Sequence, residues 1–291
     1  MKNINFNKFC LFMVLQCILY GLGDPISKAA YETVEVYSLL SVRYTIAFIV
    51  FMLFAGRRIV YGLKTTRVKV WLLPSLCVSS SYIFNNMALS LTAATNVAFI
   101  GSLSVIFTPI LAFVIYRTKL SRKHIPVLVM IVLGLYLLCG HGGLSGFGIG
   151  EVYVLITAVS ASGSLVFGSK ALEKMDPITL SAVQALLSAV IVTVCAIVFD
   201  GGINLSSATG EVWTVILYLA IGCTFLGYIL QNMALEKISA RTVALIQCLY
   251  PVMTAIFSYV ILGETLSLAG VIGAAIILAC VIAETFLTEE Y

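Results

Sequence analysis

YIFNNMAL at residues 82–89 returns as YILQNMAL at residues 228–235, and this repeated octet determines how the rest of the chain is interpreted. The two copies lie 146 positions apart, each inside a long apolar segment. The similarity continues downstream, where NVAFIGSLSVIFTPILAFVIYRTKLS (96–121) aligns without a gap with TVALIQCLYPVMTAIFSYVILGETLS (242–267). Because both blocks keep the same offset, the pattern indicates an internal duplication.

The composition is that of a membrane protein. The 291 residues are 61% hydrophobic and 10% charged, with a mean hydropathy of +1.08, whereas soluble proteins contain about 25% charged residues. Apolar runs of about 20 residues cross the ~30 Å hydrocarbon core as helices, which satisfy their own backbone hydrogen bonds. We therefore predict an all-α polytopic membrane protein, and the continuous runs argue against a transmembrane barrel.

Ten such segments are expected, joined by short loops. They cover residues 9–31, 36–55, 70–91, 95–116, 124–141, 150–171, 177–198, 212–234, 241–262 and 267–287. An offset of 146 residues contains five helices, and five is an odd number, so the second copy must enter the membrane from the opposite side. The expected architecture is ten transmembrane helices in two inverted five-helix repeats, residues 1–145 and 146–291.

Earlier parts of the two halves also match. A glycine precedes a lysine by seven positions in the first span of each half, at Gly21–Lys28 and at Gly163–Lys170. In the second spans, LLSVRYT (39–45) aligns with LSAVQAL (180–186) and sets Arg43 against Gln184. Three ordered blocks with similar offsets are improbable by chance.

The basic residues predict the orientation, because cytoplasmic loops of membrane proteins are enriched in Lys and Arg. With a cytoplasmic N-terminus, fifteen of the seventeen basic residues fall on the inner side: Lys2, Lys8, Arg57, Arg58, Lys64, Arg67, Lys69, Arg117, Lys119, Arg122, Lys123, Lys170, Lys174, Lys237 and Arg241. Both termini are therefore expected in the cytoplasm of a prokaryote. The basic loops serve topology and anionic lipid, so no nucleic-acid partner is expected.

Together these features resemble the EamA family of the drug/metabolite transporter superfamily. The resemblance rests on the two five-helix repeats, the Gly-x6-Lys pairs, Arg43, Gln184, and Pro251-Val252 followed by LGETL at 262–266. It implies export or exchange of amino acids, metabolites or drugs. The first repeat departs from the pattern: Ser104-Val105 stands where Pro251 falls in the second, and Arg117-Thr118-Lys119 replaces Gly-Glu-Thr.

The octets supply the first candidate substrate-binding residues. Tyr82 and Asn86 lie four positions apart and therefore share one helix face, and Tyr228 and Asn232 repeat this arrangement. An aromatic wall beside an amide could orient a polar small molecule. Alternatively, the asparagines hydrogen-bond between helices as structural contacts.

The centre of the ninth span supplies Gln247 and Tyr250, beside Pro251. A proline removes a backbone donor and frees the carbonyl four residues earlier, which is that of Gln247. The hypothesis is a substrate contact built from this carbonyl, the amide and the phenol; the alternative is an ordinary kink. Ser102 and Ser104 of the fourth span are expected to be close-packing positions.

Asp24, Lys28 and Arg43 are candidates for gating or coupling. Asp24 and Arg43 are each expected about 10 Å below the outer surface, and Lys28 follows Asp24 by one turn. Charges at such depth need partners. Either Asp24 pairs with Lys28 or Arg43 and fixes the first span to the second, or it takes up a proton or a cationic group during a transport cycle.

The expected function is secondary active transport of a small polar or amphipathic metabolite by alternating access. A single central cavity would be lined by spans 1, 3, 4, 6, 8 and 9, a choice taken partly from the resemblance. An intramembrane enzyme, a channel and a non-transporting scaffold are the alternatives. Eight scattered cysteines without a C-x-x-C motif favour buried apolar roles, so no metal or cofactor is expected. Protons or a counter-substrate are possible coupling partners, and the protein is expected to be a monomer or homodimer.

Overall fold

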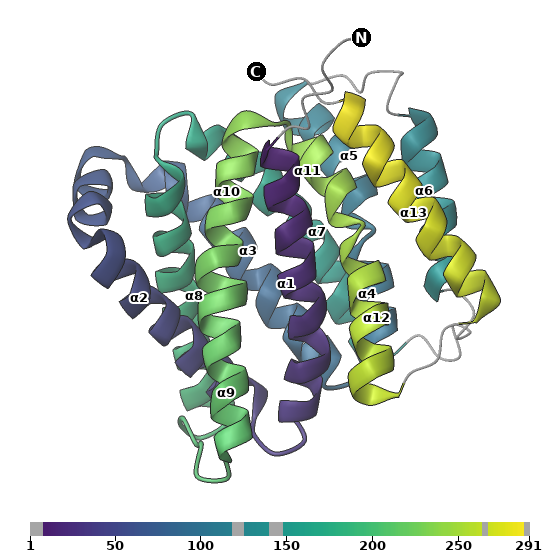
Figure 1. Ribbon diagram of the computed structural model, residues 1–291. Helices are drawn as coiled ribbons and strands as arrows, with labels where there is room; N and C mark the ends of the chain where they lie inside the picture. Colours follow the sequence, from purple (N-terminus) through teal and green to yellow (C-terminus); the bar gives the residue numbers. More distant parts are fainter. Residues whose placement is uncertain (1–7, 118–124, 140–147, 264–266, 288–291) are drawn as a thin grey trace.

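The computed structural model describes residues 8–117, 125–139, 148–263 and 267–287, and within these ranges the regular structure is entirely helical. The helices form one bundle in which the long elements run alongside one another (Figure 1). The elements are α1 (Lys8–Ala30), α2 (Val36–Thr65), α3 (Val68–Leu89), α4 (Ala94–Gly101), α5 (Ser104–Tyr116), α6 (Ile125–Cys139), α7 (Ile149–Leu172), α8 (Pro177–Phe199), α9 (Gly210–Tyr218), the π-helix η3 (Leu219–Leu226), α10 (Gly227–Lys237), α11 (Ala240–Gln247), α12 (Tyr250–Leu262) and α13 (Leu268–Leu287).

All ten predicted spans correspond to helical segments in the described residues, but two of them are interrupted and a third contains a π-helical stretch. The fourth span consists of α4 and α5, the eighth of α9, η3 and α10, and the ninth of α11 and α12. Six helical stretches are long and apolar enough to cross a membrane: Lys8–Ala30, Val36–Thr65, Ile149–Leu172, Pro177–Phe199, Gly210–Lys237 and Ala240–Leu262. Shorter apolar helices cover Ser104–Tyr116, Ile125–Leu137 and Leu268–Ala283.

The second span was predicted to end at residue 55, and this boundary is wrong. The helix kinks at Ala55, where φ is −139° and ψ is 22°, and then continues to Thr65. Packing explains the extension, because Gly62 lies so close to Thr179 of α8 that an added Cβ would come 2.8 Å from the Thr179 methyl group. A tertiary contact of this kind cannot be read from the apolar run.

The helices of the two halves interleave. α3 packs along α7, α2 along α8, α6 along α13 and α1 along α12. Each of these pairs joins a helix before residue 140 to one after residue 148. Glycine permits the closest approach: a Cβ added at Gly21 of α1 would stand 2.9 Å from the backbone nitrogen of Thr254 in α12. Such close backbone contact is typical of small residues at membrane helix interfaces.

The fourth and ninth spans break at equivalent positions, since Ser102-Leu103 and Cys248-Leu249 are also 146 residues apart. Both breaks use the same tight turn. Leu103 N donates to Ile100 O, and Leu249 N donates to Ile246 O, at 3.1 and 2.9 Å. The two spans run in opposite directions, because α4 lies below α5 whereas α11 lies above α12 (Figure 1).

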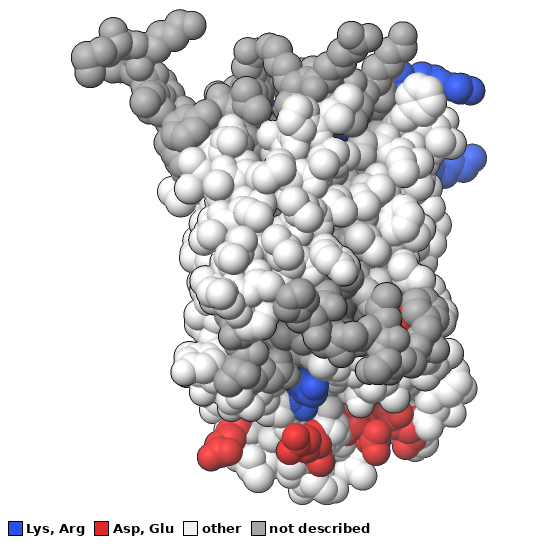
Figure 2. Space-filling view, turned by 90° about the vertical axis from the view of Figure 1, so that its right-hand side faces the viewer, with Lys and Arg blue, Asp and Glu red and all other residues white. Residues whose placement is uncertain are grey.

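The surface divides into three zones along the bundle. On the face shown in Figure 2, acidic side chains gather at one end, and Lys and Arg side chains lie mostly at the other. Large apolar side chains are exposed elsewhere along the helices, with Leu53 and Phe54 of α2 each 80% accessible and Val260 of α12 74%. Exposure of this extent suits contact with lipid chains. The predicted boundary at residue 145, and Lys2, Lys119, Arg122 and Lys123, lie outside the described residues.

Candidate functional site

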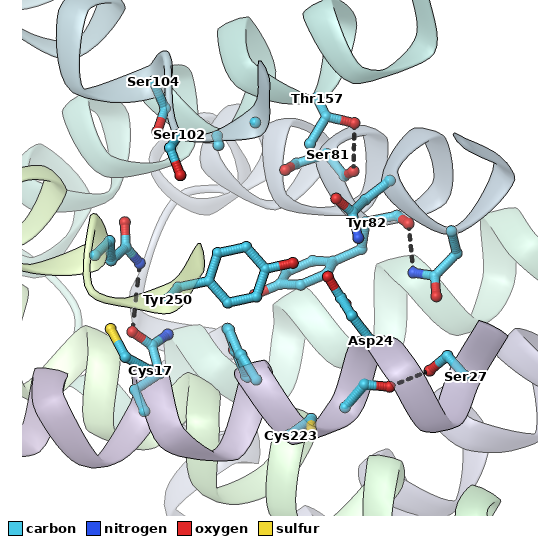
Figure 3. Close-up of a pocket in the computed structure, with 18 of the residues that line it drawn as sticks. Cys17, Asp24, Ser27, Ser81, Tyr82, Ser102, Ser104, Thr157, Cys223 and Tyr250 are labelled. Carbon is cyan, nitrogen blue, oxygen red and sulfur yellow. Dashed lines mark hydrogen bonds between the residues drawn. The ribbon is translucent and has the colours of Figure 1, made fainter. Parts of the chain in front are cut away.

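A cavity of about 120 Å³ lies between the two halves of the chain. Its lining includes residues from all six spans named in the sequence analysis, and Arg43 adds the second span. The principal polar residues of the lining are Gln16, Tyr20, Asp24, Ser27, Arg43, Ser81, Tyr82, Asn85, Asn86, Ser102, Ser104, Thr157, Gln247 and Tyr250. Figure 3 shows Tyr82 and Tyr250 reaching toward the centre, with Asp24 pointing at them from α1.

The polar face of α1 is the largest part of the site that the sequence analysis missed. Gln16, Tyr20, Asp24 and Ser27 recur every three or four positions and therefore share one helix face, and all four line the cavity. This spacing was present in the sequence. Asp24 was predicted as a site residue, and Gln16, Tyr20 and Ser27 were not.

Three glutamines, of which Gln16 and Gln231 are buried and Gln247 is partly buried, join α1, α10 and α11 at one side of the cavity. Gln16 Nε2 donates to Gln231 Oε1 at 2.6 Å, and Gln247 Nε2 donates to the same oxygen at 3.1 Å. Gln247 also reaches Gln16 Oε1 at 3.3 Å. A buried amide is costly unless it is hydrogen-bonded, so this cluster holds the three helices together. Gln247 contributes to it through its side chain.

The first octet faces the cavity. Tyr82 and Asn86 both belong to the lining. Asn86 Nδ2 donates to the carbonyl of Tyr82 at 2.7 Å, and Tyr31 Oη donates to Asn86 Oδ1 at 2.6 Å. Asn86 thereby fixes the end of α3 to the end of α1, and it performs the structural role while also facing the cavity.

The second octet has a different orientation, and the cavity lining excludes Tyr228 and Asn232. The Tyr228 ring lies behind that of Tyr82, with 5.5 Å between the ring centroids. Asn232 is 1% exposed and donates to Ser181 Oγ and Gln184 Oε1, both at 2.8 Å. In this structure neither residue lines the cavity, and the role of the second octet in substrate binding stays a prediction.

The charged group formed by Asp24, Lys28 and Arg43 also differs from one expectation. Asp24 forms no ion pair with Lys28, Arg43 or any other residue that the structure describes. Lys28 Nζ instead donates to the carbonyl of Thr92 at 3.3 Å, and Arg43 Nε donates to Thr224 Oγ1 at 2.9 Å. The alternative in which an ion pair at Asp24 fixes the first span to the second is therefore wrong for this structure.

The two interrupted helices bring residues from both sides of each break to the cavity. Ser102 and Ser104 line it from the break between α4 and α5, and Cys248 and Tyr250 line it from the break between α11 and α12. The serines were expected only as packing residues. A helix break exposes side chains on both sides of the turn, and no periodicity argument applies across it.

Comparisons with known proteins identify the family of the chain. The model of the EamA-like transporter family matches residues 7–140 and again residues 148–283. The chain belongs to the EamA-like transporter family. An uncharacterized transporter of Archaeoglobus fulgidus is 26% identical over 275 residues, which span 94% of this chain and 84% of that protein. A solved structure covers 96% of both chains at a TM-score of 0.78 and 19% identity, which concerns the fold alone.

Two relatives of this EamA-like transporter carry names that specify a cargo. A riboflavin transporter, ImpX of Fusobacterium nucleatum, is 24% identical over 65% of both chains. A probable amino-acid metabolite efflux pump of Salmonella typhimurium is 27% identical over 60% of this chain and 61% of that protein. Family membership makes the chain a multi-pass membrane protein whose partners include a small-molecule substrate and lipid, and its relatives are transporters rather than enzymes.

Proposed function

We propose that the protein is a secondary active transporter that moves a small polar or amphipathic metabolite across the cytoplasmic membrane of a prokaryote by alternating access. The observation that carries the proposal is the cavity that residues of both halves line jointly, with polar side chains from each half among its lining. In transporters built from inverted repeats, the substrate site lies at the interface of the repeats, near the middle of the membrane.

Several features support inverted repeats over residues 1–145 and 146–291. The family model matches each half separately, and the fourth and ninth spans run in opposite directions with the same break (Figure 1). The packing pairs are consistent with a two-fold relation, because α2 and α8, the second helix of each half, pack against each other, as do the fifth helices α6 and α13. Two such halves can exchange conformations, so that outward-open and inward-open states have similar energies.

We propose that Tyr82, Asn86, Gln247 and Tyr250 contact the substrate, since all four line the cavity. Tyr228 and Asn232 would reach it only in another conformation of the bundle. The charge separation in Figure 2 supports an orientation with the Lys- and Arg-rich end, and with it both termini, in the cytoplasm.

Counterflow in vesicles tests the proposal. The purified protein is reconstituted, and the vesicles are loaded with candidate metabolites in turn, together with the same labelled metabolite outside. We expect saturable accumulation that depends on the internal unlabelled pool. Flux proportional to concentration without saturation would indicate a channel, and conversion of the labelled compound would indicate an enzyme.

Native cysteines provide a second measurement. Cys223 lines the cavity, whereas Cys195 of α8 does not. A chain that retains only Cys223 should react with a membrane-impermeant thiol reagent from either side of the membrane, and the transported metabolite should slow the reaction. The matched chain that retains only Cys195 should show no such protection. Reaction of Cys223 from one side only, under all conditions, would contradict alternating access.

A further inference from the structure

Building on the proposed function, we infer that Gln16, Gln231 and Gln247 form a latch that closes one end of the cavity. The closed end is the Lys- and Arg-rich end of the bundle, where α1 begins (Figures 1 and 2), and it is called the basic end below. These hydrogen bonds have to break before the cavity can open toward the basic end. With the proposed orientation, the structure corresponds to the state that faces outward.

The cavity lies away from the basic end. Along α1 its lining runs from Gln16 to Ser27, close to the C-terminus of that helix. Along α3 the lining runs from Ser81 to Asn86, again near the C-terminus. These two helix ends meet, because Tyr31 Oη donates to Asn86 Oδ1 at 2.6 Å. Both helices therefore place the lining toward the acidic end of the bundle.

Apolar packing fills the bundle between the latch and the basic end. Each latch glutamine is followed, one helical turn closer to that end, by a buried apolar residue: Met13 in α1, Leu235 in α10 and Val243 in α11. All three are at most 3% exposed, and they belong to one buried cluster that also includes Leu172 and Ile238. Gln16 and Gln247 line the cavity on the other side. The latch is therefore the polar boundary between the cavity and a dry plug.

The bonds of Gln16 cross from the first half of the chain to the second. Its Nε2 donates to Gln231 Oε1 at 2.6 Å and to the carbonyl of Gly227 at 3.5 Å, and its Oε1 accepts from Gln247 Nε2 at 3.3 Å. α1 cannot separate from α10 and α11 while these bonds hold. Water can replace them once the amides are exposed, so their net contribution is modest and the latch is reversible.

The equivalent level of the other half has a different composition. At the offsets of the internal repeat, the positions of Gln231, Gln247 and Gln16 are taken by Asn85, Gly101 and Ala158. Glycine and alanine have no side chain that can bond to the amide of Asn85. Asn85 and Gly101 instead line the cavity. A three-amide latch is thus present at the basic end and not at the equivalent level of the acidic end, which favours the state that is closed at the basic end.

Access to Cys223 from the two sides of the membrane measures the latch. The full-length chain that retains only Cys223 is placed in membrane vesicles, and its reaction with a membrane-impermeant thiol reagent is timed from each side. A tag at the N-terminus locates the basic side. Gln231→Asn keeps the amide but shortens the side chain, so its oxygen can no longer serve both partners. We expect the ratio of the basic-side rate to the acidic-side rate to rise about tenfold.

A second variant and a control separate the latch from general loosening. Gln16→Asn removes the same bonds from the other half and should raise the ratio as well, so the test does not depend on one variant folding. Gln184→Asn is the matched control. Gln184 is 2% exposed and accepts from Asn232 Nδ2 of α10 at 2.8 Å, but both residues belong to the second half. This control should leave the ratio unchanged.

The outcomes distinguish the latch from the proposed transport function. An unchanged ratio in both latch variants, with Cys223 reactive from both sides, would overturn the latch and leave alternating access intact. Reaction from the acidic side alone in every variant would overturn both. An equal rise in Gln184→Asn would also overturn the latch, because it would mean that shortening any buried glutamine loosens the bundle.

Discussion

The two interrupted helices are alike in backbone and unlike in the side chains that they present. The break at Ser102-Leu103 and the break at Cys248-Leu249 use the same hydrogen-bonded turn. The first presents two serines to the cavity, and the second presents Gln247, Cys248 and Tyr250. The two breaks therefore share one backbone geometry and differ in the side-chain chemistry that they present.

The two octets also have similar sequences but different positions relative to the cavity. Asn86 faces the cavity, whereas Asn232, its equivalent, is enclosed by α8. The two octets have nearly the same sequence, but their side chains have different neighbours because different helices pack against them. Pairs of equivalent residues in the two halves therefore serve as internal controls, and four such pairs test the comparison.

The largest difference is expected between Gly21→Ala and Gly163→Ala. An added Cβ at Gly21 meets backbone atoms of Met253 and Thr254, whereas at Gly163 it meets the Cys77 thiol at 2.9 Å, which can rotate away. We expect Gly21→Ala to lower the free energy of unfolding by about 3 kcal/mol and Gly163→Ala by about 1 kcal/mol. Apparent melting temperatures in detergent measure this. Equal losses of stability in the two variants would mean that both helix interfaces adjust equally well to an added methyl group.

The asparagines of the octets should separate stability from transport. Asn232→Ala removes two buried hydrogen bonds and should lower the free energy of unfolding by about 2 kcal/mol without changing the apparent affinity in counterflow. Asn86→Ala should cost about 1 kcal/mol and weaken that affinity, because Asn86 also lines the cavity. Loss of affinity in Asn232→Ala at full protein yield would show that the second octet does contact substrate.

The left-handed residues that end α5 and α12 should respond in opposite directions. Arg117 has φ 57° and Gly263, 146 residues later, has φ 68°. Since a side chain is strained in this conformation, Gly263→Ala should cost about 1 kcal/mol, and Arg117→Gly should gain about 0.5 kcal/mol. Thermal unfolding of both variants against the wild type measures the difference. A loss on Arg117→Gly would point to an interaction of the Arg117 side chain that outweighs its backbone strain.

The smallest effect is expected from Pro251→Val, which gives the second break the residue found at the equivalent position 105. The first half forms the same turn without a proline there, so the turn does not require the ring. We expect the free energy of unfolding to change by less than about 0.5 kcal/mol and the rate of counterflow to stay the same. A marked loss of transport would show that the proline itself, rather than the break, is needed in the second half.

The helical segments were predictable because each one must satisfy its backbone hydrogen bonds in lipid and must therefore be long and apolar. The extension of α2 to Thr65 was not, since it depends on contact between Gly62 and Thr179. The proline at 251 suggested a kink in the ninth span, but nothing in the fourth span signalled the matching break at Ser102-Leu103. Both breaks are maintained by packing in the shared core.

The same division applies to the site. Spacing alone placed Tyr82 and Asn86 on one face, and polarity alone marked Asp24 and Arg43 as residues that need partners. Helices far away in sequence determine which groups these residues contact. They also determine whether Tyr228 and Asn232 line the cavity.

By itself, the sequence determined the membrane environment, the helical segments and the family, and it indicated an internal repeat, because these follow from composition, periodicity and repetition along one chain. Only the tertiary structure decided which equivalent residues face the cavity, that Asp24 and Arg43 face it unpaired with each other, and that three glutamines join α1, α10 and α11. The reason is physical: hydrogen bonds and charge pairing between helices depend on distances in space, and a linear pattern of polar residues specifies which face they share but not what lies opposite.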